Sequence, residues 1–279
     1  MPNYRLTAIN VGSFPLGESD KVLTLFSAER GLTRAVAKGA RKPGAKIAGR
    51  AEVLKVNRLL LATGRSLDII TQAEELVGFS QLRQDLNKLS YALYYAELTA
   101  QFGQGLADES ETFFHYFCNA LKLLLQIEAD PILLCLQFEL YLLATLGYKP
   151  ELDSCVVCRQ TLTDYNVRAF DHDLGGIICQ SCPTNKRIDS SNRVAEGSFS
   201  YESDYSGSVS LKTYVTPLVW KSLILSSRQS DQAMPQSIPL NNNLIRANQA
   251  GHKLIQTYIE HKAGRKMKAL ELISSIPLK

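Results

Sequence analysis

Short apolar runs separated by turn residues occupy the first 78 residues of the chain. The runs are rich in Val, Ile, Leu and Thr, and the breaks between them contain Gly or Pro, which can end a strand. The runs read YRLTAINV, KVLTLFSAE, LTRAVAKGA, AEVLKVNRLLL and RSLDIITQAEEL. Five short strands, with no strong helical pattern between most of them, predict a small β-barrel.

From Ser80 onward, the apolar residues recur at the spacing of an α-helix, and Ser80 is expected to cap the first helix. Three apolar stripes predict three helices whose shared surface packs as a bundle. The third helix is expected to begin at Asp130-Pro131 and to end at Gly147. The stripes are Leu82, Leu86, Leu89 and Leu93; Phe113, Phe117, Leu121 and Leu124; and Ile132, Leu136, Leu140 and Leu143.

Helical patterning returns over 216–225 and over 244–273, whereas the intervening and preceding polar stretches are rich in Ser. A chain of 279 residues exceeds the usual size of one domain, so we expect a multidomain α+β protein. The predicted division is 1–79 for the barrel, 80–150 and 211–279 for a helical domain, 151–183 for an inserted four-cysteine segment and 184–210 for a polar loop.

Positive charge is concentrated in the barrel, although the net charge of the chain is only +4. Residues 1–80 contain 12 Lys or Arg against 7 Asp or Glu, and the remainder contains 19 against 20. Gly and Pro breaks predict an exposed loop over 38–50, from which long cationic side chains can reach phosphates. A solvated basic loop without a partner is the alternative. The cations of residues 29–50 are Arg30, Arg34, Lys38, Arg41, Lys42, Lys46 and Arg50.

Aromatic residues are scarce in the same region, and residues 27–78 contain none. Barrels that grip single strands usually stack bases on aromatic side chains. Any stacking must therefore come from Tyr4, Phe14, Phe26 or a guanidinium group. We expect binding that is led by the phosphate backbone, weakly sequence-specific and steeply salt-dependent.

Four of the six cysteines form two Cys-x-x-Cys pairs, Cys155 with Cys158 and Cys179 with Cys182. Two such pairs can surround one Zn²⁺ tetrahedrally. Catalytic zinc keeps one position open, so a set of four cysteines favours a single structural Zn²⁺. A bare thiol cluster and an iron–sulfur centre are the alternatives.

Residues around the two pairs complete this interpretation. Gly175-Gly176 is expected to supply the flexibility that the turn before Cys179 needs. His172 stands alone between the pairs and is expected to be exposed to solvent rather than to bind metal. Cys118 and Cys135 lie in apolar helical runs and are interpreted as small buried hydrophobic side chains.

The chain carries no Walker loop, no Gly-x-Gly-x-x-Gly, no Gly-x-Ser-x-Gly and no His-Glu-x-x-His motif. It also lacks an apolar run long enough to span a membrane, and MPNYRLTAIN has no signal-peptide pattern. We therefore expect a cytoplasmic protein that is not an enzyme and has no membrane partner. In the reducing cytoplasm, paired cysteines favour a metal site over disulfides.

Four segments, taken in order, give the chain a resemblance to a known family. They are GESDKVLTLFSAERG, VAKGARKP, LLATLGYKPELDSCVVC and HKAGRKMKAL. The most specific part is Gly-Tyr-x-Pro-Glu-Leu-Asp-x-Cys-x-x-Cys, at 147–158. The segments resemble the bacterial recombination mediator family RecO, and the resemblance thins between 184 and 243.

The resemblance implies an oligonucleotide-binding (OB-fold) barrel, a helical domain and a zinc-binding segment inserted between helices. It implies a nucleoid-associated DNA repair mediator without a catalytic site, which binds single- and double-stranded DNA and anneals complementary strands. Its implied partners are RecR, the C-terminal tail of single-strand binding protein and, indirectly, RecA. The family's DNA contacts correspond to Lys38, Arg41 and Lys42, and the charge pattern adds Arg34, Lys46 and Arg50. Zinc ligation corresponds to Cys155, Cys158, Cys179 and Cys182, and the metal is not implied to be essential for activity.

Two other classes of protein remain as alternatives. A barrel with a zinc ribbon also suits an RNA-binding factor of translation or RNA processing, which would prefer RNA to single-stranded DNA at fixed salt. A zinc-dependent hydrolase is disfavoured by the filled all-cysteine shell, and zinc-dependent DNA cleavage would point to it.

Overall fold

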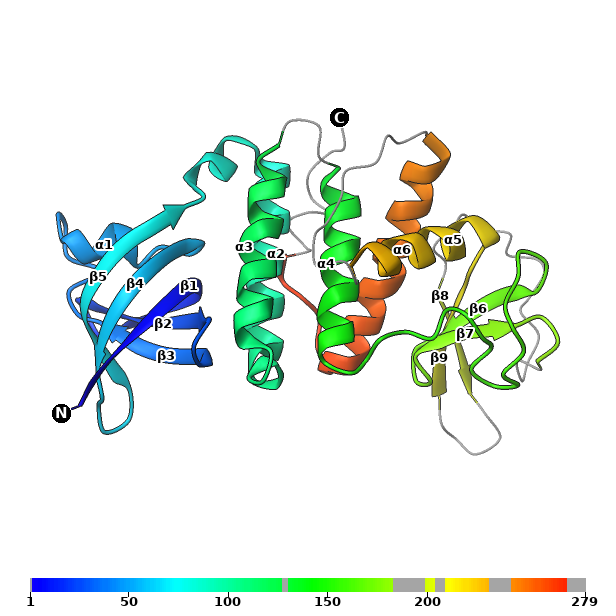
Figure 1. The fold of residues 1–279 in the computed structure, drawn as a ribbon, viewed down its shortest axis with the longest axis horizontal. Helices are drawn as coiled ribbons and strands as arrows, with labels where there is room; N and C mark the ends of the chain where they lie inside the picture. Colours follow the sequence, from blue (N-terminus) through cyan, green and yellow to red (C-terminus); the bar gives the residue numbers. More distant parts are fainter. Residues whose placement is uncertain (1, 127–129, 183–198, 204–208, 231–241, 270–279) are drawn as a thin grey trace. The chain divides into compact units, whose positions relative to one another are not determined.

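The computed structural model describes residues 2–126, 130–182, 199–203, 209–230 and 242–269. It shows the expected α+β fold, with an N-terminal five-stranded sheet followed by a largely helical region (Figure 1). By compactness the chain divides into a first unit, Met1–Pro131 with Met267–Lys279, and a second unit, Ile132–Lys266. The barrel and its adjoining helices therefore lie in the first unit, and the four cysteines lie in the second.

The five predicted strands form a closed barrel in the order β1-β2-β3-β5-β4. Neighbouring strands are antiparallel except β3 and β5, which pair in parallel. This is the strand order of an OB-fold, so the predicted architecture of this region is confirmed. The strands are β1 (Asn3–Leu16), β2 (Asp20–Ser27), β3 (Gly31–Ala37), β4 (Lys55–Ala62) and β5 (Asp68–Gly78).

The barrel interior is filled by alternate residues of its strands, among them Leu23 and Leu25 of β2 and Ala35 and Ala37 of β3. The region predicted as an exposed loop over 38–50 contains a short helix, α1 (Lys46–Arg50). Its apolar side chains explain the difference, because Ala40, Ile47 and Ala51 pack into the barrel core. The packing of these three side chains therefore holds residues 40–51 against the barrel.

Helices of the first unit pack on the outside of the barrel, α2 against β1 and α3 against β2. Phe26 meets Phe113 edge to face, with ring centroids 5.5 Å apart. Asp85, rather than Ser80, caps α2, since its carboxylate accepts from the main-chain N–H groups of Asn87 and Lys88. The elements are η1 (Ser80–Gln84), α2 (Leu86–Phe102), η2 (Gly103–Leu106) and α3 (Ser110–Leu124).

The second unit combines helices with a four-stranded sheet of order β7-β6-β9-β8. Strand β8 and the start of β9 fall in the predicted polar loop 184–210, whose residues 184–198 and 204–208 lie outside the described part. Helix α6 ends at Ala263, and Gly264 follows with φ +65°, so the helix predicted over 244–273 does not continue there; residues 270–273 lie outside the described part. The elements are α4 (Pro131–Thr145), β6 (Val167–Asp171), β7 (Gly176–Cys179), β8 (Phe199–Ser203), β9 (Val209–Tyr214), α5 (Pro217–Ser230) and α6 (Asn242–Ala263).

Buried polar side chains connect the helices of the second unit. The Nδ1 atom of His252, on α6, lies 2.9 Å from Oε2 of Glu139, on α4, and the glutamate is fully buried. Gln137 of α4 donates to Gln229 of α5 at 2.7 Å. Among the described helices, none combines the length and apolar character needed to cross a membrane.

Candidate nucleic-acid interface and metal centre

The six candidate DNA contacts form one continuous basic segment, 34–50, which runs from β3 through the following turn into α1. Arg34 projects from β3, whereas Lys38, Arg41 and Lys42 lie in the turn, and all four are exposed. Lys46 and Arg50 are the first and last residues of α1, the former exposed and the latter half-buried. The fold therefore places the candidates on adjoining elements at one part of the barrel.

The positive charge of the basic segment is only weakly balanced by nearby acids, through the electrostatic interaction of Asp20 with Lys38 and Lys42. Among the described residues, none of its six cations forms an ion pair with a carboxylate. Other barrel cations do, such as Lys55 with Glu75 at 2.5 Å and Arg58 with Glu74 at 3.2 Å. Because the cations of the segment are unpaired and mostly solvated, they can meet phosphates without breaking ion pairs.

Hydrogen bonds fasten the basic segment to the turn between β1 and β2. The main-chain N–H of Gly39 donates to Oδ1 of Asp20 at 2.8 Å. The main-chain N–H of Arg41 donates to the main-chain carbonyl of Ser19 at 2.9 Å. The bond from Gly39 is the main reason that the pKa of Asp20 lies below its usual range, with Ser19 contributing next. The turn and the basic segment therefore hold a defined relative position.

The aromatic rings of the barrel differ in accessibility. Phe26 is fully buried against Phe113. The ring of Tyr4 is covered by the guanidinium of Arg30, 4.1 Å from its centroid, and its hydroxyl bonds to Asp68. Burial and this bond raise the pKa of Tyr4 to about 12. Phe14, in contrast, is 47% exposed.

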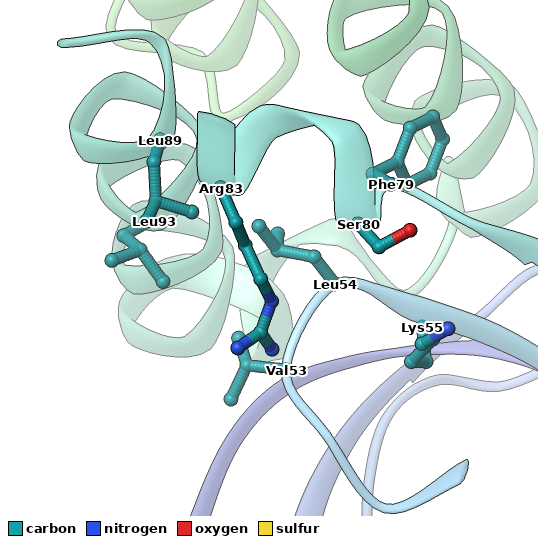
Figure 2. A pocket seen from close by; sticks show the side chains of 8 residues that line it. All are labelled: Val53, Leu54, Lys55, Phe79, Ser80, Arg83, Leu89 and Leu93. Carbon is teal, nitrogen blue, oxygen red and sulfur yellow. The ribbon is translucent and has the colours of Figure 1, made fainter. Parts of the chain in front are cut away.

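A small apolar pocket of about 140 Å³ lies in the first unit between the start of β4 and η1 with α2 (Figure 2). Its two cations are already paired: Lys55 with Glu75, and Arg83 with Glu52 at 2.8 Å. We therefore assign no anion-binding role to this pocket. Its lining is Val53, Leu54, Lys55, Phe79, Ser80, Arg83, Leu89 and Leu93.

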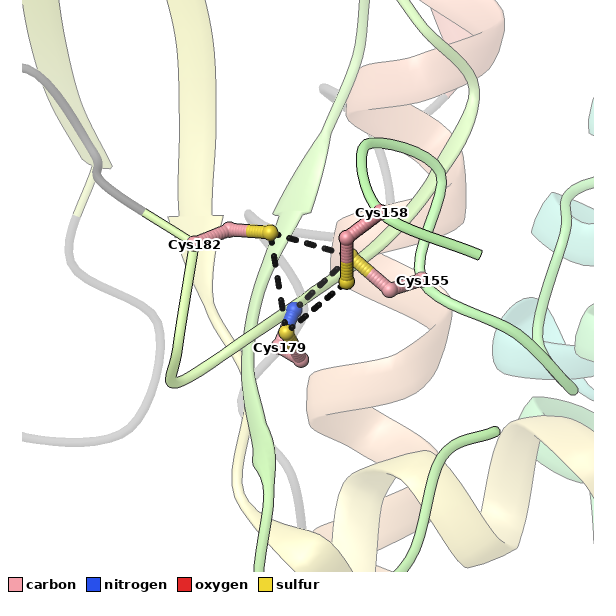
Figure 3. Close-up of side chains that lie close together, drawn as sticks. All are labelled: Cys155, Cys158, Cys179 and Cys182. Carbon is pink, nitrogen blue, oxygen red and sulfur yellow. Dashed lines mark hydrogen bonds between the residues drawn. The ribbon is translucent and has the colours of Figure 1, made fainter. Parts of the chain in front are cut away.

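The structure brings together all four cysteines of the two pairs (Figure 3). The sulfur atoms of Cys158 and Cys179 are 3.6 Å apart, and that of Cys182 is 3.7 Å from those of both Cys155 and Cys179. Four sulfurs around a tetrahedral metal with bonds of about 2.3 Å would lie about 3.8 Å apart. The four-cysteine cluster can therefore bind a metal ion with little rearrangement.

Main-chain groups favour the thiolate form at one side of the cluster. Burial opposes ionisation of Cys155, but N–H groups of Cys158, Cys179 and Val157 outweigh it and lower the pKa of the thiol to about 6. Cys179 contributes such a bond, from its N–H to the sulfur of Cys155 at 3.3 Å. At Cys182, burial and the neighbouring thiols raise the pKa instead. A bound metal would remove the difference between these two thiols, because thiols that coordinate a metal lose their protons.

The two glycines before Cys179 allow close packing, and Gly175 also adopts a backbone conformation that favours glycine, as expected for the turn. A Cβ at Gly176 would lie 2.4 Å from a methyl carbon of Val156, in the first cysteine turn, and 2.7 Å from the carbonyl of Glu151. Gly175 has φ +69°, and a Cβ there would lie 2.4 Å from the hydroxyl of Tyr258. Glycine therefore lets the second cysteine strand approach the first turn.

His172 is buried, so the expectation that it is solvent-exposed was wrong. Its Nε2 atom lies 2.8 Å from Oγ1 of Thr213, and its ring packs beside Phe170. Burial, followed by the charge of His261, lowers the pKa of His172 to about 4. The sequence alone gave no signal of this, because Thr213 lies 41 positions away. His172 is not part of the four-cysteine cluster.

The remaining two cysteines lie in helices. Cys135 is fully buried, as expected, and Cys118 is only half-buried. Burial raises the pKa of Cys118 to about 12, so this thiol stays protonated. Sequence reasoning did not foresee that Cys135 lies with Glu139 and His252 in a buried cluster, with potential ligand atoms within 4.8 Å of one another.

Comparisons with known proteins agree with both parts of the structure. Residues 1–79 match the family model "Recombination protein O N terminal", and residues 83–213 match "Recombination protein O C terminal". A DNA repair protein RecO from Acaryochloris marina is 37% identical over 205 residues, which cover 71% of this chain and 69% of that protein. One from Gloeobacter violaceus is 40% identical over 187 residues, 66% of this chain and 70% of the relative.

A longer match extends the similarity over nearly the whole chain. The DNA repair protein RecO of a Synechococcus strain is 29% identical over 285 aligned residues, 98% of this chain and 89% of the relative. Fold and site define a protein that joins an OB-fold barrel to a helical region with a cluster of four cysteines that can bind a metal ion. The chain belongs to the recombination protein O (RecO) family. The resemblance seen in the sequence is thereby confirmed.

Proposed function

We propose that this chain is a DNA repair mediator that binds single- and double-stranded DNA through phosphate contacts and anneals complementary strands. The observation that supports this proposal is the basic segment, whose six cations are mostly exposed and form no ion pair within the described residues. Such a surface attracts a polyanion without desolvating paired charges. The proposed contacts are Arg34, Lys38, Arg41, Lys42, Lys46 and Arg50.

Family membership supports DNA as the polyanion, since the relatives are named DNA repair proteins. The proposal includes RecR, the tail of single-strand binding protein and, through them, the loading of RecA. It places the chain in the cytoplasm at the nucleoid and gives it no catalytic step. Titration of RecR and single-strand binding protein against the chain tests the partners directly.

An annealing assay on complementary oligonucleotides tests the role of the basic segment. Single charge reversals Lys38→Glu, Lys42→Glu and Lys46→Glu should each slow annealing and weaken DNA binding. Lys122→Glu, on an exposed face of α3, changes the charge by the same amount and should leave both unchanged. Equal annealing rates for all variants would contradict the assignment, and a marked preference for RNA in competition would favour the RNA-binding alternative.

The four-cysteine cluster is proposed to hold one structural Zn²⁺ with Cys155, Cys158, Cys179 and Cys182 as ligands. Sulfur distances of 3.6 and 3.7 Å and the complete set of thiols support this. A filled shell leaves no position for substrate, so the metal would hold the two cysteine turns together. DNA cleavage that requires zinc would overturn this part of the proposal.

A further inference from the structure

A β-bulge in β1 determines which side of the barrel the end of that strand presents. Asn10 pairs with Leu25 and Gly12 with Thr24, so Val11 is an extra residue in β1. Side chains alternate along a strand, and one extra residue reverses the alternation after it. Before the bulge, even-numbered residues such as Leu6 and Ala8 point into the barrel core. After it, even-numbered residues point outward.

The bulge is held by buried hydrogen bonds. Asn10 is fully buried and donates from Nδ2 to the carbonyl of Ala51 at 2.8 Å. The side-chain Oδ1 of Asn10 accepts from the main-chain N–H of Gly12 at 3.2 Å. The main-chain carbonyl of Asn10 accepts from the main-chain N–H of Leu54 at 2.9 Å. These hydrogen bonds stabilise the bulge and the reversed side-chain alternation that follows it, which agrees with the use of bulges to redirect side chains.

The reversal places Phe14 on the outer face of the sheet. Phe14 pairs with Val22, which pairs in turn with Val36 of β3. Opposed residues share a face of the sheet, so the ring stands beside two valines that are themselves buried. Without the bulge, Phe14 would point inward with the core residues Leu23 and Leu25.

The same outer face carries a cation of the basic segment. Gly12, Thr24 and Arg34 form the neighbouring row, so Arg34 shares the face of Phe14. Two interstrand spacings, about 10 Å, separate β1 from β3. One short nucleic-acid strand can therefore contact both the ring and Arg34.

Toward the turn between β1 and β2, part of this outer face is exposed, although Val22 and Val36 themselves are buried. Phe26 lies four residues further along β2 from Val22, and there α3 covers the face through Phe113. At the other end, Phe14 is 47% exposed and Leu16 is 42% exposed. The other two aromatic residues of 2–78, Tyr4 and Phe26, are covered by Arg30 and Phe113.

We propose that Phe14 stacks on an unpaired base of single-stranded DNA while the basic segment holds the flanking phosphates. This rests on the proposed function, because it uses the same phosphate contacts. An exposed ring beside unpaired cations is the combination that single-strand binders use, since every base has a face that can stack. Duplex DNA keeps its bases stacked on each other, so the ring gives a preference for single strands.

Salt titration of DNA binding by Phe14→Ala tests the proposal. We expect about tenfold weaker binding to oligothymidylate, with an unchanged slope of log affinity against log salt, because no phosphate contact is lost. Binding to duplex DNA and to an abasic phosphodiester strand of equal length should match wild type. Phe14→Trp should retain affinity and show fluorescence quenching by oligothymidylate, over the constant signal of the chain's one other tryptophan, Trp220.

Two controls separate stacking from other effects. Tyr165→Ala removes an aromatic ring that is 89% exposed in the second unit and should bind DNA as wild type does. Phe14→Leu keeps apolar bulk without an aromatic face and should behave like Phe14→Ala.

The outcomes distinguish this proposal from the proposed function. Wild-type affinity of Phe14→Ala for oligothymidylate would overturn the stacking role, as would equal weakening on single-stranded, duplex and abasic DNA. In both cases Lys38→Glu would still lower affinity and the salt slope. If Lys38→Glu, Lys42→Glu and Lys46→Glu all bind as wild type, the basic segment itself is overturned, and the stacking proposal with it.

Discussion

The Nη1 atom of Arg41 donates a hydrogen bond to the main-chain carbonyl of Gly17 at 2.6 Å. Gly17 belongs to the turn between β1 and β2, at φ +59°, so this bond connects the basic segment to the end of the hairpin that carries Phe14. Arg41 therefore has two roles in the proposed interface. One of its five N–H donors holds the turn, and its charge faces solvent.

Substitution of Arg41 can separate its hydrogen bond to Gly17 from its positive charge. Arg41→Gln keeps an N–H donor for Gly17 but removes the charge. It should weaken binding to single-stranded DNA and reduce the salt slope by about 0.7, the value for one phosphate contact. Arg41→Lys keeps the charge and should keep the slope. Affinity measured at several salt concentrations checks both, and a slope unchanged in Arg41→Gln would show that the guanidinium serves only the turn.

Removal of the metal should destabilise the second unit without abolishing DNA binding by the barrel. Cys179→Ala removes one of the four proposed ligands, a buried side chain, and the free energy of metal binding contributes directly to folding. We expect loss of bound zinc by elemental analysis and a lower melting temperature, with DNA affinity within about twofold of wild type because phosphate contacts dominate it. Cys118→Ala, outside the cluster, should retain the metal. Loss of DNA binding in proportion to zinc would contradict the prediction.

His172 should make stability depend on pH. Its pKa is lowered to about 4 in the folded protein from 6.5, so below pH 6.5 the unfolded chain binds more protons than the folded chain. Its contribution is complete above pH 6.5 and decreases as the pH falls toward 4. At pH 5 the loss amounts to about 2 kcal/mol.

Urea denaturation of wild type and His172→Gln across this range measures that contribution. Gln stays neutral and retains a group that can bond to Thr213, so the variant should lose less stability between pH 7.5 and 5. Metal loss at low pH affects both proteins alike, so the difference between their curves reports His172. Parallel curves would show that His172 does not carry the pH dependence.

The buried pair of Glu139 and His252 should contribute far more to stability than a surface pair. Replacing one member by Ala leaves a buried group without its partner at 2.9 Å, which should cost about 3–5 kcal/mol. A double-mutant cycle of Glu139→Ala and His252→Ala, followed by urea denaturation, should give a coupling free energy of about 1–3 kcal/mol. The exposed pair Arg58–Glu74 is the control and should give less than about 1 kcal/mol. Equal coupling for the two pairs would contradict the prediction.

Much of the fold followed from local patterns. The five strands, the helix over 110–124 and the end of α4 near Gly147 agree with alternation, helical spacing and glycine position. The start of the first helix was less accurate, because residues 80–84 form the short helix η1 and Asp85, not Ser80, caps α2 through the N–H groups of Asn87 and Lys88. Strand β8, with the sequence FSYES, was missed because the Ser-rich stretch around it was interpreted as a polar loop, although β9 pairs with it.

Some features of the candidate site could likewise be predicted from the sequence, and others could not. Residue identity and spacing established the cluster of cations, the two cysteine pairs and the family resemblance, because charge and ligand chemistry are properties of the residues themselves. Tertiary structure alone decided that Phe14 points outward, that His172 is buried and that Gly176 is required for close approach. Each of these depends on a partner distant in sequence: β2 for the bulge, Thr213 for the histidine and Val156 for the glycine. Sequence patterns describe what a residue can do, and packing determines which partner it meets.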